Sequence, residues 1–399
     1  MGSHVRVGVE DSLWIAAGQL TEINAQHMTR IRTILEALTS RWPHLTRNGR
    51  CCSSMAAAVG SRCAAPSTTQ EISMSSSDER VAIVGGGYMG GGMAQTLAAH
   101  GIECVLVDAT PELSRERVQH LHEEAETFTA DGLIPASAGA AIRDKLSPAD
   151  SLESALVGVW YVAEVVPERM DVKSQVLASI SSQVPADVVI ASNTSAMPIG
   201  ELAESVVHPE RFLGVHWMNP APFVPCVEVI PSGHTSSAVV DRTLELLARV
   251  GKVATVVGDA PGFVANRLQY ALFREATRIV EDGVAGPADI DEVVRNSFGF
   301  RLPFFGPFAI ADIAGLDVYR DGFATMQAAY GDRIGTPALL TEMVEGGRHG
   351  LKNGQGFYDF ADGRADQVAR YRDRAYAALT RLRDDLGGVP WHEHGSPEA

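Results

Sequence analysis

The strongest constraint on the fold is a regular alternation between short apolar runs and helix-like segments, which begins at Arg80 and continues to about Pro261. The apolar runs have the length and β-branched content of buried strands, and segments such as Met89–His100 and Asp171–Gln183 separate them with helical periodicity. The runs are RVAIV, ECVLVD, WYVAEVV, DVVIAS, RFLGVHW, VEVI and VATVV. This alternation predicts an α/β fold, a doubly wound and largely parallel sheet with helices on both faces.

Beyond residue 261 the strand-like runs stop, and the sequence predicts a second, mainly helical domain. Asp289 and Gly283 supply start and stop signals for the helices expected at Phe263–Asp282, Ala288–Asn296 and Ala338–Glu345. We therefore expect domains at 78–261 and 262–365, with a helical extension and flexible tail at 366–399. The phenylalanines of this part are most simply core or interface residues, namely Phe298, Phe300, Phe304, Phe305 and Phe308.

Residues 1–77 lack the alternating pattern and predict a disordered leader. After Arg50 the chain is rich in Ser and Ala without a sustained period, so it has little apolar surface to bury. A targeting peptide is the alternative, but acidic residues such as Glu10 and Glu22 disagree with that composition. A natural start at Met74 is a further interpretation of this segment.

Charge and cysteine content exclude several classes of protein. The net charge of −16 argues against a nucleic-acid surface, because phosphates reward an excess of Lys and Arg. We find no uninterrupted apolar run of about eighteen residues, so a membrane span is not expected. The five cysteines are odd in number and lack paired metal-binding spacings, so neither a disulfide framework nor a metal site is expected. A reducing cytoplasm is the simplest location.

A glycine-rich turn follows the first strand-like run and predicts a dinucleotide site. Gly85, Gly87 and Gly90 have the G-x-G-x-x-G spacing, with Tyr88 and Met89 between them, and a helix is expected to start there. Asp108 ends the second run, where a carboxylate would meet the ribose hydroxyls. An acid at that position favours NAD over NADP, although Arg115 and Arg117 could reverse the preference. The alternative is a plain turn with a solvated aspartate.

Polar residues collect just beyond the later strand-like runs. Ser195 follows DVVIAS, and His216 and Asn219 lie at the end of RFLGVHW. Glu228 lies inside the apolar run VEVI, where an unpaired carboxylate would be costly, so His216 is its expected partner. Each residue also has a simpler interpretation. His216 could be a core histidine, and Glu228 could bond only to backbone. Ser195 could cap the following helix, and Asn219 could belong to an ordinary Asn-Pro turn.

Six motifs in order resemble the L-3-hydroxyacyl-CoA dehydrogenase family, and they span about residues 80 to 360. They are VAIVGGGYMGGGMAQ, VVPERMDVK, SNTSAMPI, GVHWMNPAP with VEVI, DAPGFVANR and KNGQGFYDF. The resemblance implies a Rossmann-like NAD domain followed by an all-α dimerisation domain, and therefore a homodimer. It also implies that His216 is the general base for the 3-hydroxyl and that Glu228 orients it. The remaining positions that it implies are Ser195, Asn219 and Asn266 in the active site and Glu168, Lys173, Ser195, Asn219 and Lys352 beside the cofactor.

The substrate is less well defined than the reaction. CoA-using relatives carry a lysine-rich segment after the ribose-binding acid, but residues 111–143 contain no lysine. Parts of the chain are similar to the carnitine dehydrogenase and lambda-crystallin/gulonate dehydrogenase branch, whose members use free 3-hydroxy acids. KNGQGFYDF and IADIAGLDVY are more similar to the acyl-CoA branch. We expect a short-chain 3-hydroxyacyl-CoA as substrate, with a free 3-hydroxy acid or a non-catalytic NAD-binding protein as alternatives.

Overall fold

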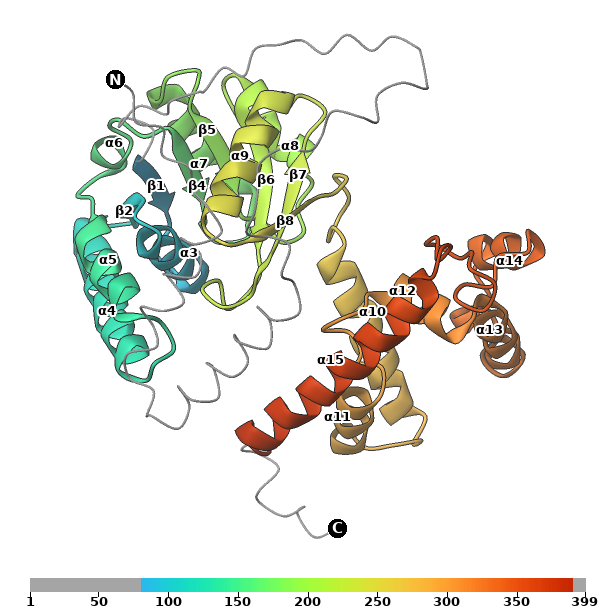
Figure 1. The fold of residues 1–399 in the computed structure, drawn as a ribbon. Helices are drawn as coiled ribbons and strands as arrows, with labels where there is room; N and C mark the ends of the chain where they lie inside the picture. The colour runs from blue at the N-terminus through green and yellow to red at the C-terminus, as the bar shows by residue number, and fades with distance from the viewer. Residues whose placement is uncertain (1–79, 390–399) are drawn as a thin grey trace, which may run out of the picture. The chain divides into compact units, whose positions relative to one another are not determined.

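The structure, a computed structural model, describes residues 80–389 and contains one eight-stranded sheet (Figure 1). The leader predicted at residues 1–77 lies outside the described residues, and its assignment stays a prediction. The strand order is β3-β2-β1-β4-β5-β6-β7-β8. The strands are β1 (Arg80–Val84), β2 (Glu103–Val107), β3 (Leu146–Pro148), β4 (Tyr161–Glu164), β5 (Val189–Ser192), β6 (Phe212–Trp217), β7 (Cys226–Pro231) and β8 (Val253–Val256).

The pairing direction confirms the predicted, largely parallel sheet. Strands β1 to β6 pair in parallel, whereas β7 pairs antiparallel with β6 and parallel with β8. The chain order reverses between β1 and β4, and in such sheets ligands bind beyond the carboxyl ends of the strands at that point. All seven predicted strands are present, and only the short β3 was not foreseen. Its single buried residue, Leu146, gives almost no periodic signal.

Helices cover both faces of the sheet because successive strand residues point to opposite sides. In β1, Val81 and Ile83 pack into one apolar cluster, and Ala82 and Val84 pack into the other. The first face is covered by α3 (Tyr88–Ala99), α4 (Pro111–Ala130), α5 (Ala136–Lys145) and α9 (Ser237–Arg249). The second is covered by α6 (Leu152–Ala155), α7 (Met170–Gln183) and α8 (Ile199–Ala203). This double covering explains why the strands are apolar on both sides.

The remainder of the described chain is helical, as the sequence predicts. Its helices are α10 (Ala265–Glu281), α11 (Pro287–Asn296), α12 (Pro307–Ala314), α13 (Leu316–Tyr330), α14 (Ala338–Glu345) and α15 (Arg364–Leu386). The buried part of its core is small and contains Ala311, Leu316, Leu340, Met343 and Val344. Of the predicted phenylalanines, Phe300, Phe304 and Phe305 pack their rings against tyrosines of α15. Within residues 80–389 we find no helix with the length and apolar character needed to cross a membrane.

Candidate active site at the carboxyl edge of the sheet

The turn between β1 and α3 leaves room for a ligand against its backbone. Gly85 has a φ of +110°, and a Cβ there would lie 2.6 Å from the carbonyl oxygen of Val165. A Cβ on Gly90 would collide with the carbonyl of Gly85, so only glycine permits this close packing of helix on strand. By contrast, a Cβ on Gly87 would meet nothing within 4 Å. The backbone at Gly87, just before α3, is therefore open to a phosphate group.

Asp108 lies at the end of β2 and is held against this turn. Its Oδ2 accepts a hydrogen bond from the N–H of Gly86 at 3.0 Å, and its Oδ1 accepts one from Ala109 at 2.7 Å. Arg115, which could have favoured NADP, is occupied by ion pairs with Glu112 and Asp150. Beside Asp108 lies a cavity of about 890 Å³, lined by residues that include Gly85, Gly87, Tyr88, Met89, Gly90, Val107, Val166 and Pro167. This cavity and its carboxylate fit the adenosine half of a dinucleotide.

His216 and Glu228 form a buried pair across two neighbouring strands. They are directly opposite each other in the β6–β7 register, so their side chains leave the sheet on the same face. His216 Nδ1 lies 2.9 Å from Glu228 Oε2, and the two residues are only 5% and 3% exposed. If Nδ1–H donates to the carboxylate, the lone pair on Nε2 remains available for a proton.

The second oxygen of Glu228 is bound at the start of α10. Glu228 Oε1 accepts hydrogen bonds from the N–H groups of Val264 and Ala265, both at 3.0 Å. These donors belong to the positive end of the helix, which favours the ionised carboxylate. Phe263, in a left-handed conformation with a φ of +46°, places its ring 5.7 Å from the His216 ring. Both oxygens of Glu228 are thus occupied, by backbone as well as by His216.

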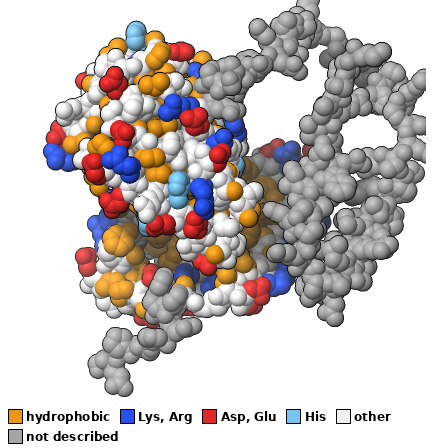
Figure 2. Space-filling model, turned by 90° about the vertical axis from the view of Figure 1, so that its left-hand side faces the viewer, with side chains coloured by type: hydrophobic (Ala, Val, Ile, Leu, Met, Phe, Trp, Pro, Cys, Tyr) orange, Lys and Arg blue, Asp and Glu red, His pale blue; other side chains and the backbone are white. Residues whose placement is uncertain are grey.

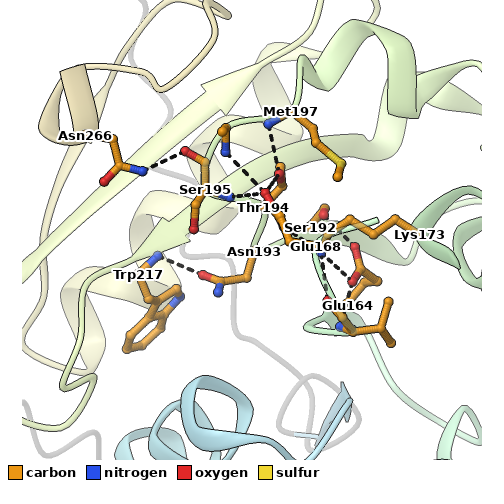
Figure 3. A network of polar contacts seen from close by, with 12 residues as sticks. Glu164, Glu168, Lys173, Ser192, Asn193, Thr194, Ser195, Met197, Trp217 and Asn266 are labelled. Atoms are coloured by element: carbon orange, nitrogen blue, oxygen red, sulfur yellow. Dashed lines mark hydrogen bonds and ion pairs between the residues drawn. The ribbon is translucent and has the colours of Figure 1, made fainter. Parts of the chain in front are cut away.

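A second buried network joins β4 to β5 (Figure 3). Glu164 is fully buried, and its Oε2 accepts a hydrogen bond from the Ser192 hydroxyl at 2.5 Å. Lys173, which is 1% exposed, donates to Glu164 Oε1 at 2.9 Å and to the carbonyl of Val166 at 3.1 Å. Its ammonium also lies 3.4 Å from Glu168 Oε2. Lys173 therefore holds Glu168 in place from inside the protein.

Glu168 in turn fixes the turn that contains Ser195 (Figure 3). Its Oε1 accepts hydrogen bonds from the Thr194 hydroxyl at 2.5 Å and from the N–H of Ser195 at 2.8 Å. Partial burial opposes ionisation of Glu168, but these hydrogen bonds and the charge on Lys173 outweigh it and lower the pKa of the carboxyl. Asn266, from the first turn of α10, donates to the carbonyl of Ser195 at 2.9 Å. Ser195 is therefore positioned from both sides.

Two predicted site residues are not drawn into these networks. Asn219 follows β6 with an exposed side chain, just before a cis peptide bond to Pro220. Lys352 forms an ion pair with Asp317 at 2.7 Å in the helical part, and it is not among the residues that line the cavity beside Asp108. The cofactor role that the resemblance implies for Lys352 stays a prediction.

Sequence reasoning missed several residues that order the site. Glu164 lies in the apolar run WYVAEVV, so the same signal that selected Glu228 could have found it. Asn193, one residue beyond β5, accepts a hydrogen bond from the Trp217 N–H at 2.9 Å and so links the ends of β5 and β6. Asp259 accepts from the N–H groups of Ile199 and Gly200 at the start of α8. Neither of these two residues has a local sequence pattern that indicates its partner.

Family models match almost the whole described chain. The model of the 3-hydroxyacyl-CoA dehydrogenase NAD binding domain matches residues 80–260, and that of the C-terminal domain of the same enzymes matches residues 262–360. A model of beta-keto acid cleavage enzymes matches residues 1–43, which lie outside the described part.

Individual relatives agree with the family models. The chain is 34% identical to a 5-formyl-3-hydroxy-2-methylpyridine 4-carboxylate 5-dehydrogenase of Mesorhizobium japonicum, over 76% of this chain and 97% of the relative. It is 33% identical to a probable 3-hydroxybutyryl-CoA dehydrogenase of Bacillus subtilis, over 71% and 98%. A solved 3-hydroxyacyl-CoA dehydrogenase of Archaeoglobus fulgidus superposes with a TM-score of 0.64 at 28% identity, over 76% and 98%. The chain therefore belongs to the 3-hydroxyacyl-CoA dehydrogenase family, whose cofactor is NAD.

Proposed function

We propose that this protein oxidises the 3-hydroxyl of a 3-hydroxyacyl compound and that His216 is the general base. The observation that carries the proposal is the buried His216–Glu228 pair at the carboxyl edge of the sheet, 2.9 Å apart. His216 Nε2 accepts the proton of the hydroxyl, and Glu228 stabilises the imidazolium that forms. Asp108 and the glycine-rich turn would hold NAD, which would supply the hydride acceptor for C3. In the reverse direction the protonated His216 returns its proton to the carbonyl oxygen.

The neighbouring polar residues hold the substrate in position for this proton transfer. Ser195 is supported through its N–H by Glu168 and through its carbonyl by Asn266, so its hydroxyl is free to bind the reacting oxygen. Asn219 follows β6 three residues after His216 and offers an exposed amide to the nicotinamide end of the cofactor. The buried Lys173 acts through Glu168. Preorganised donors of this kind cost no reorganisation during the reaction.

The first candidate for the substrate is a short-chain L-3-hydroxyacyl-CoA. It is supported by both family models and by the relative named a probable 3-hydroxybutyryl-CoA dehydrogenase.

The second candidate is a free 3-hydroxy acid, and the charges around α4 favour it. Arg115 is paired with Glu112 and Asp150, and Arg143 is paired with Glu126, so carboxylates compete with CoA phosphates for both arginines. The Mesorhizobium relative is named for a substrate with a free carboxylate. In addition, oxidation of a free 3-hydroxy acid yields a beta-keto acid, the compound class in the description of the family that matches residues 1–43.

A substrate panel tests the proposal. The purified full chain is incubated with NAD and either 3-hydroxybutyryl-CoA or a free acid (3-hydroxybutyrate, carnitine or gulonate), and NADH is followed by absorbance. Formation of NADH with either kind of substrate supports the reaction. Tight binding of NADH without turnover of any 3-hydroxy compound would instead identify a non-catalytic NAD-binding protein.

We also propose that the protein is located in the cytoplasm and forms a homodimer. The apolar face of α10 would form the dimer contact. No residue of α10 is buried, and its aromatic side chains Tyr270 and Phe273 are 67% and 64% exposed. Apolar faces of this kind mark association surfaces. Sedimentation of the wild type and of Phe273→Glu tests the dimer, because the variant is expected to sediment as a monomer. A monomeric wild type would refute it.

A further inference from the structure

The loop between β6 and β7 carries Asn219, whose side chain has no support of its own. Asn219 is exposed, and within residues 80–389 its amide makes no hydrogen bond. The direction of this amide therefore depends on the backbone of the loop. That backbone is folded into a turn by the carbonyl of Pro220, which accepts hydrogen bonds from the N–H groups of Phe223 at 3.1 Å and Val224 at 3.0 Å.

A buried lysine outside the loop holds two of its carbonyl groups. Lys252 Nζ donates to the carbonyl oxygens of Ala221 and Val224, the second at 2.9 Å, and it lies 5.2 Å from the centre of the Trp217 ring. Lys252 is 8% exposed, and burial lowers the pKa of its ammonium. Within the described chain no carboxylate pairs with it. Because burial of a charge is costly unless its donors are satisfied, the carbonyls and the ring face keep this ammonium in place.

The sheet topology brings Lys252 to the loop, although the residue precedes a strand. Lys252 comes directly before β8, and β8 pairs in parallel with β7. Because β7 runs antiparallel to β6, the amino ends of β7 and β8 lie at the same edge of the sheet as the carboxyl end of β6. Lys252 therefore lies at the edge that carries His216. A search for polar residues that follow strands does not find it.

The other side of the loop packs against two helices. A Cβ on Gly92 of α3 would lie 3.0 Å from Pro222 Cδ and 3.1 Å from Ala221 Cβ, so loop and helix are in close contact there. Phe223 also packs its ring edge-on against Phe128 of α4, with the ring centroids 5.4 Å apart. The loop is thus fixed by the buried ammonium on one side and by α3 and α4 on the other.

We propose that Lys252 is a positioning residue for the cofactor, which holds the loop so that the Asn219 amide meets the nicotinamide end of NAD. The inference rests on the proposed function, which assigns that contact to Asn219, and it names the residue that sets the geometry. Without the ammonium, the carbonyls of Ala221 and Val224 lose a buried donor, and the loop rearranges to bring them to water. Asn219 then loses its direction, while the cavity beside Asp108 keeps its shape.

Binding of two nucleotides to Lys252→Met tests this inference. NADH carries the nicotinamide ring, whereas ADP-ribose has the same adenosine and pyrophosphate groups without it. The variant should bind NADH about five- to ten-fold more weakly, the loss of about one hydrogen bond, and should bind ADP-ribose like the wild type. Fluorescence titration measures NADH and calorimetry measures ADP-ribose, both with the full chain. An equal loss for the two nucleotides, or no loss for either, would overturn the inference.

A double-mutant cycle connects Lys252 to Asn219. Asn219→Ala removes the amide itself and should weaken NADH binding by a similar factor. If Lys252 acts through Asn219, adding Lys252→Met to Asn219→Ala should weaken NADH binding by less than about two-fold more. Two full losses that multiply would show that Lys252 acts by another route and would contradict the proposal.

Gly92→Ala disturbs the same loop from the other side and serves where Lys252→Met does not fold. The added Cβ presses on Pro222, so this variant should also lower NADH affinity and leave ADP-ribose binding unchanged. Gly91→Ala is its control, because a Cβ there meets the flexible end of the Leu121 side chain instead. Where Lys252→Met does not fold, equal NADH affinity in the two glycine variants overturns the inference.

Lys145→Met is the matched control for the lysine. The Lys145 side chain is 41% exposed and is paired with Asp144 in the last turn of α5. The left-hand side of Figure 1, where α4 and α5 lie, faces the viewer in Figure 2, and acidic and basic side chains are interspersed there. Removal of one such exposed charge should leave the affinity for both nucleotides unchanged. A loss of NADH affinity equal to that of Lys252→Met would refute the role of Lys252.

The inference and the proposed function fail in different ways. The absence of NADH formation with every 3-hydroxy compound would refute the proposed function, and the two affinities would still decide the role of Lys252. Turnover by the wild type, together with unchanged nucleotide binding in Lys252→Met, would overturn the inference and leave the proposed reaction standing.

Discussion

Both the sheet edge at the carboxyl ends of β4, β5 and β6 and the surface of α4 carry many charged side chains, but those at the sheet edge are buried and those on α4 are exposed. At the sheet edge, Glu164, Lys173, His216 and Glu228 are all buried, and each has a partner within about 3 Å. On α4, Arg115 and its partners remain largely exposed. A buried ion that loses its partner is left in a poor solvent, whereas an exposed one is rehydrated.

The two regions therefore differ in how freely their charged side chains can rearrange. The charged pairs at the buried edge are fixed, because they cannot rearrange without leaving a charge unpaired. The exposed charged side chains of α4 can change partners at little cost in stability.

The largest effect is expected from His216→Ala. Loss of the general base should lower kcat by about 10²–10⁴-fold, while NADH affinity stays nearly unchanged. Stopped-flow turnover and NADH fluorescence measure the two quantities. His234→Ala, which removes an exposed histidine of the same domain, is the control and should behave as wild type. A large loss of NADH affinity in His216→Ala would show that the residue is structural.

The contrast in stability between the two regions can be measured directly. Lys173→Met leaves the fully buried Glu164 without its cation, so we expect a loss of about 3–5 kcal/mol in the free energy of unfolding. Arg115→Met breaks exposed pairs and should cost no more than about 1 kcal/mol. Urea denaturation of both variants gives the comparison. Equal losses would abolish the distinction between the buried edge and α4.

Sequence patterns predicted the sheet well because its strands are buried on both faces and separated by periodic helices. The glycine-rich turn and Asp108 could also be predicted, because each directly follows a strand that the sequence pattern predicts. Partners distant in sequence were harder to predict. The bond between Asn193 and Trp217 depends on the register of β5 against β6, and the two donors to Glu228 from α10 depend on how the chain turns at Phe263. Neither is encoded in a local pattern.

Asp108 is intermediate between the buried charges of the sheet edge and the exposed charges of α4, because it is half-buried and its carboxylate is bonded to backbone only. Its carboxylate is expected to bind the ribose 2′-hydroxyl and to repel a 2′-phosphate. Asp108→Ala should therefore lower the preference for NAD over NADP by about ten-fold, the equivalent of one charge-assisted hydrogen bond. The ratio of kcat/KM for the two cofactors measures it. An unchanged ratio would refute the ribose-binding role of Asp108.

The smallest effect is expected for the pH dependence of stability in Glu168→Gln. The pKa of Glu168 is lowered by its hydrogen bonds and by Lys173, although burial opposes this shift. A carboxyl with a lowered folded pKa stabilises the protein above its ordinary value of 4.5, and this contribution is lost as the pH falls through the folded pKa. The stability gap between wild type and Glu168→Gln should therefore be constant near neutral pH and shrink below about pH 4.5.

Asp171→Asn is the exposed counterpart of this experiment. Asp171 also has a lowered pKa, caused chiefly by its hydrogen bond from Arg169, but it is fully exposed. Added salt should reduce the difference in unfolding free energy between the wild type and Asp171→Asn. The corresponding difference for Glu168→Gln should stay largely intact, because Lys173 contacts Glu168 from the protein interior. If salt removed both stability differences equally, the charge of Glu168 would be as well screened as the surface charges of α4, and Lys173 would not protect it from solvent.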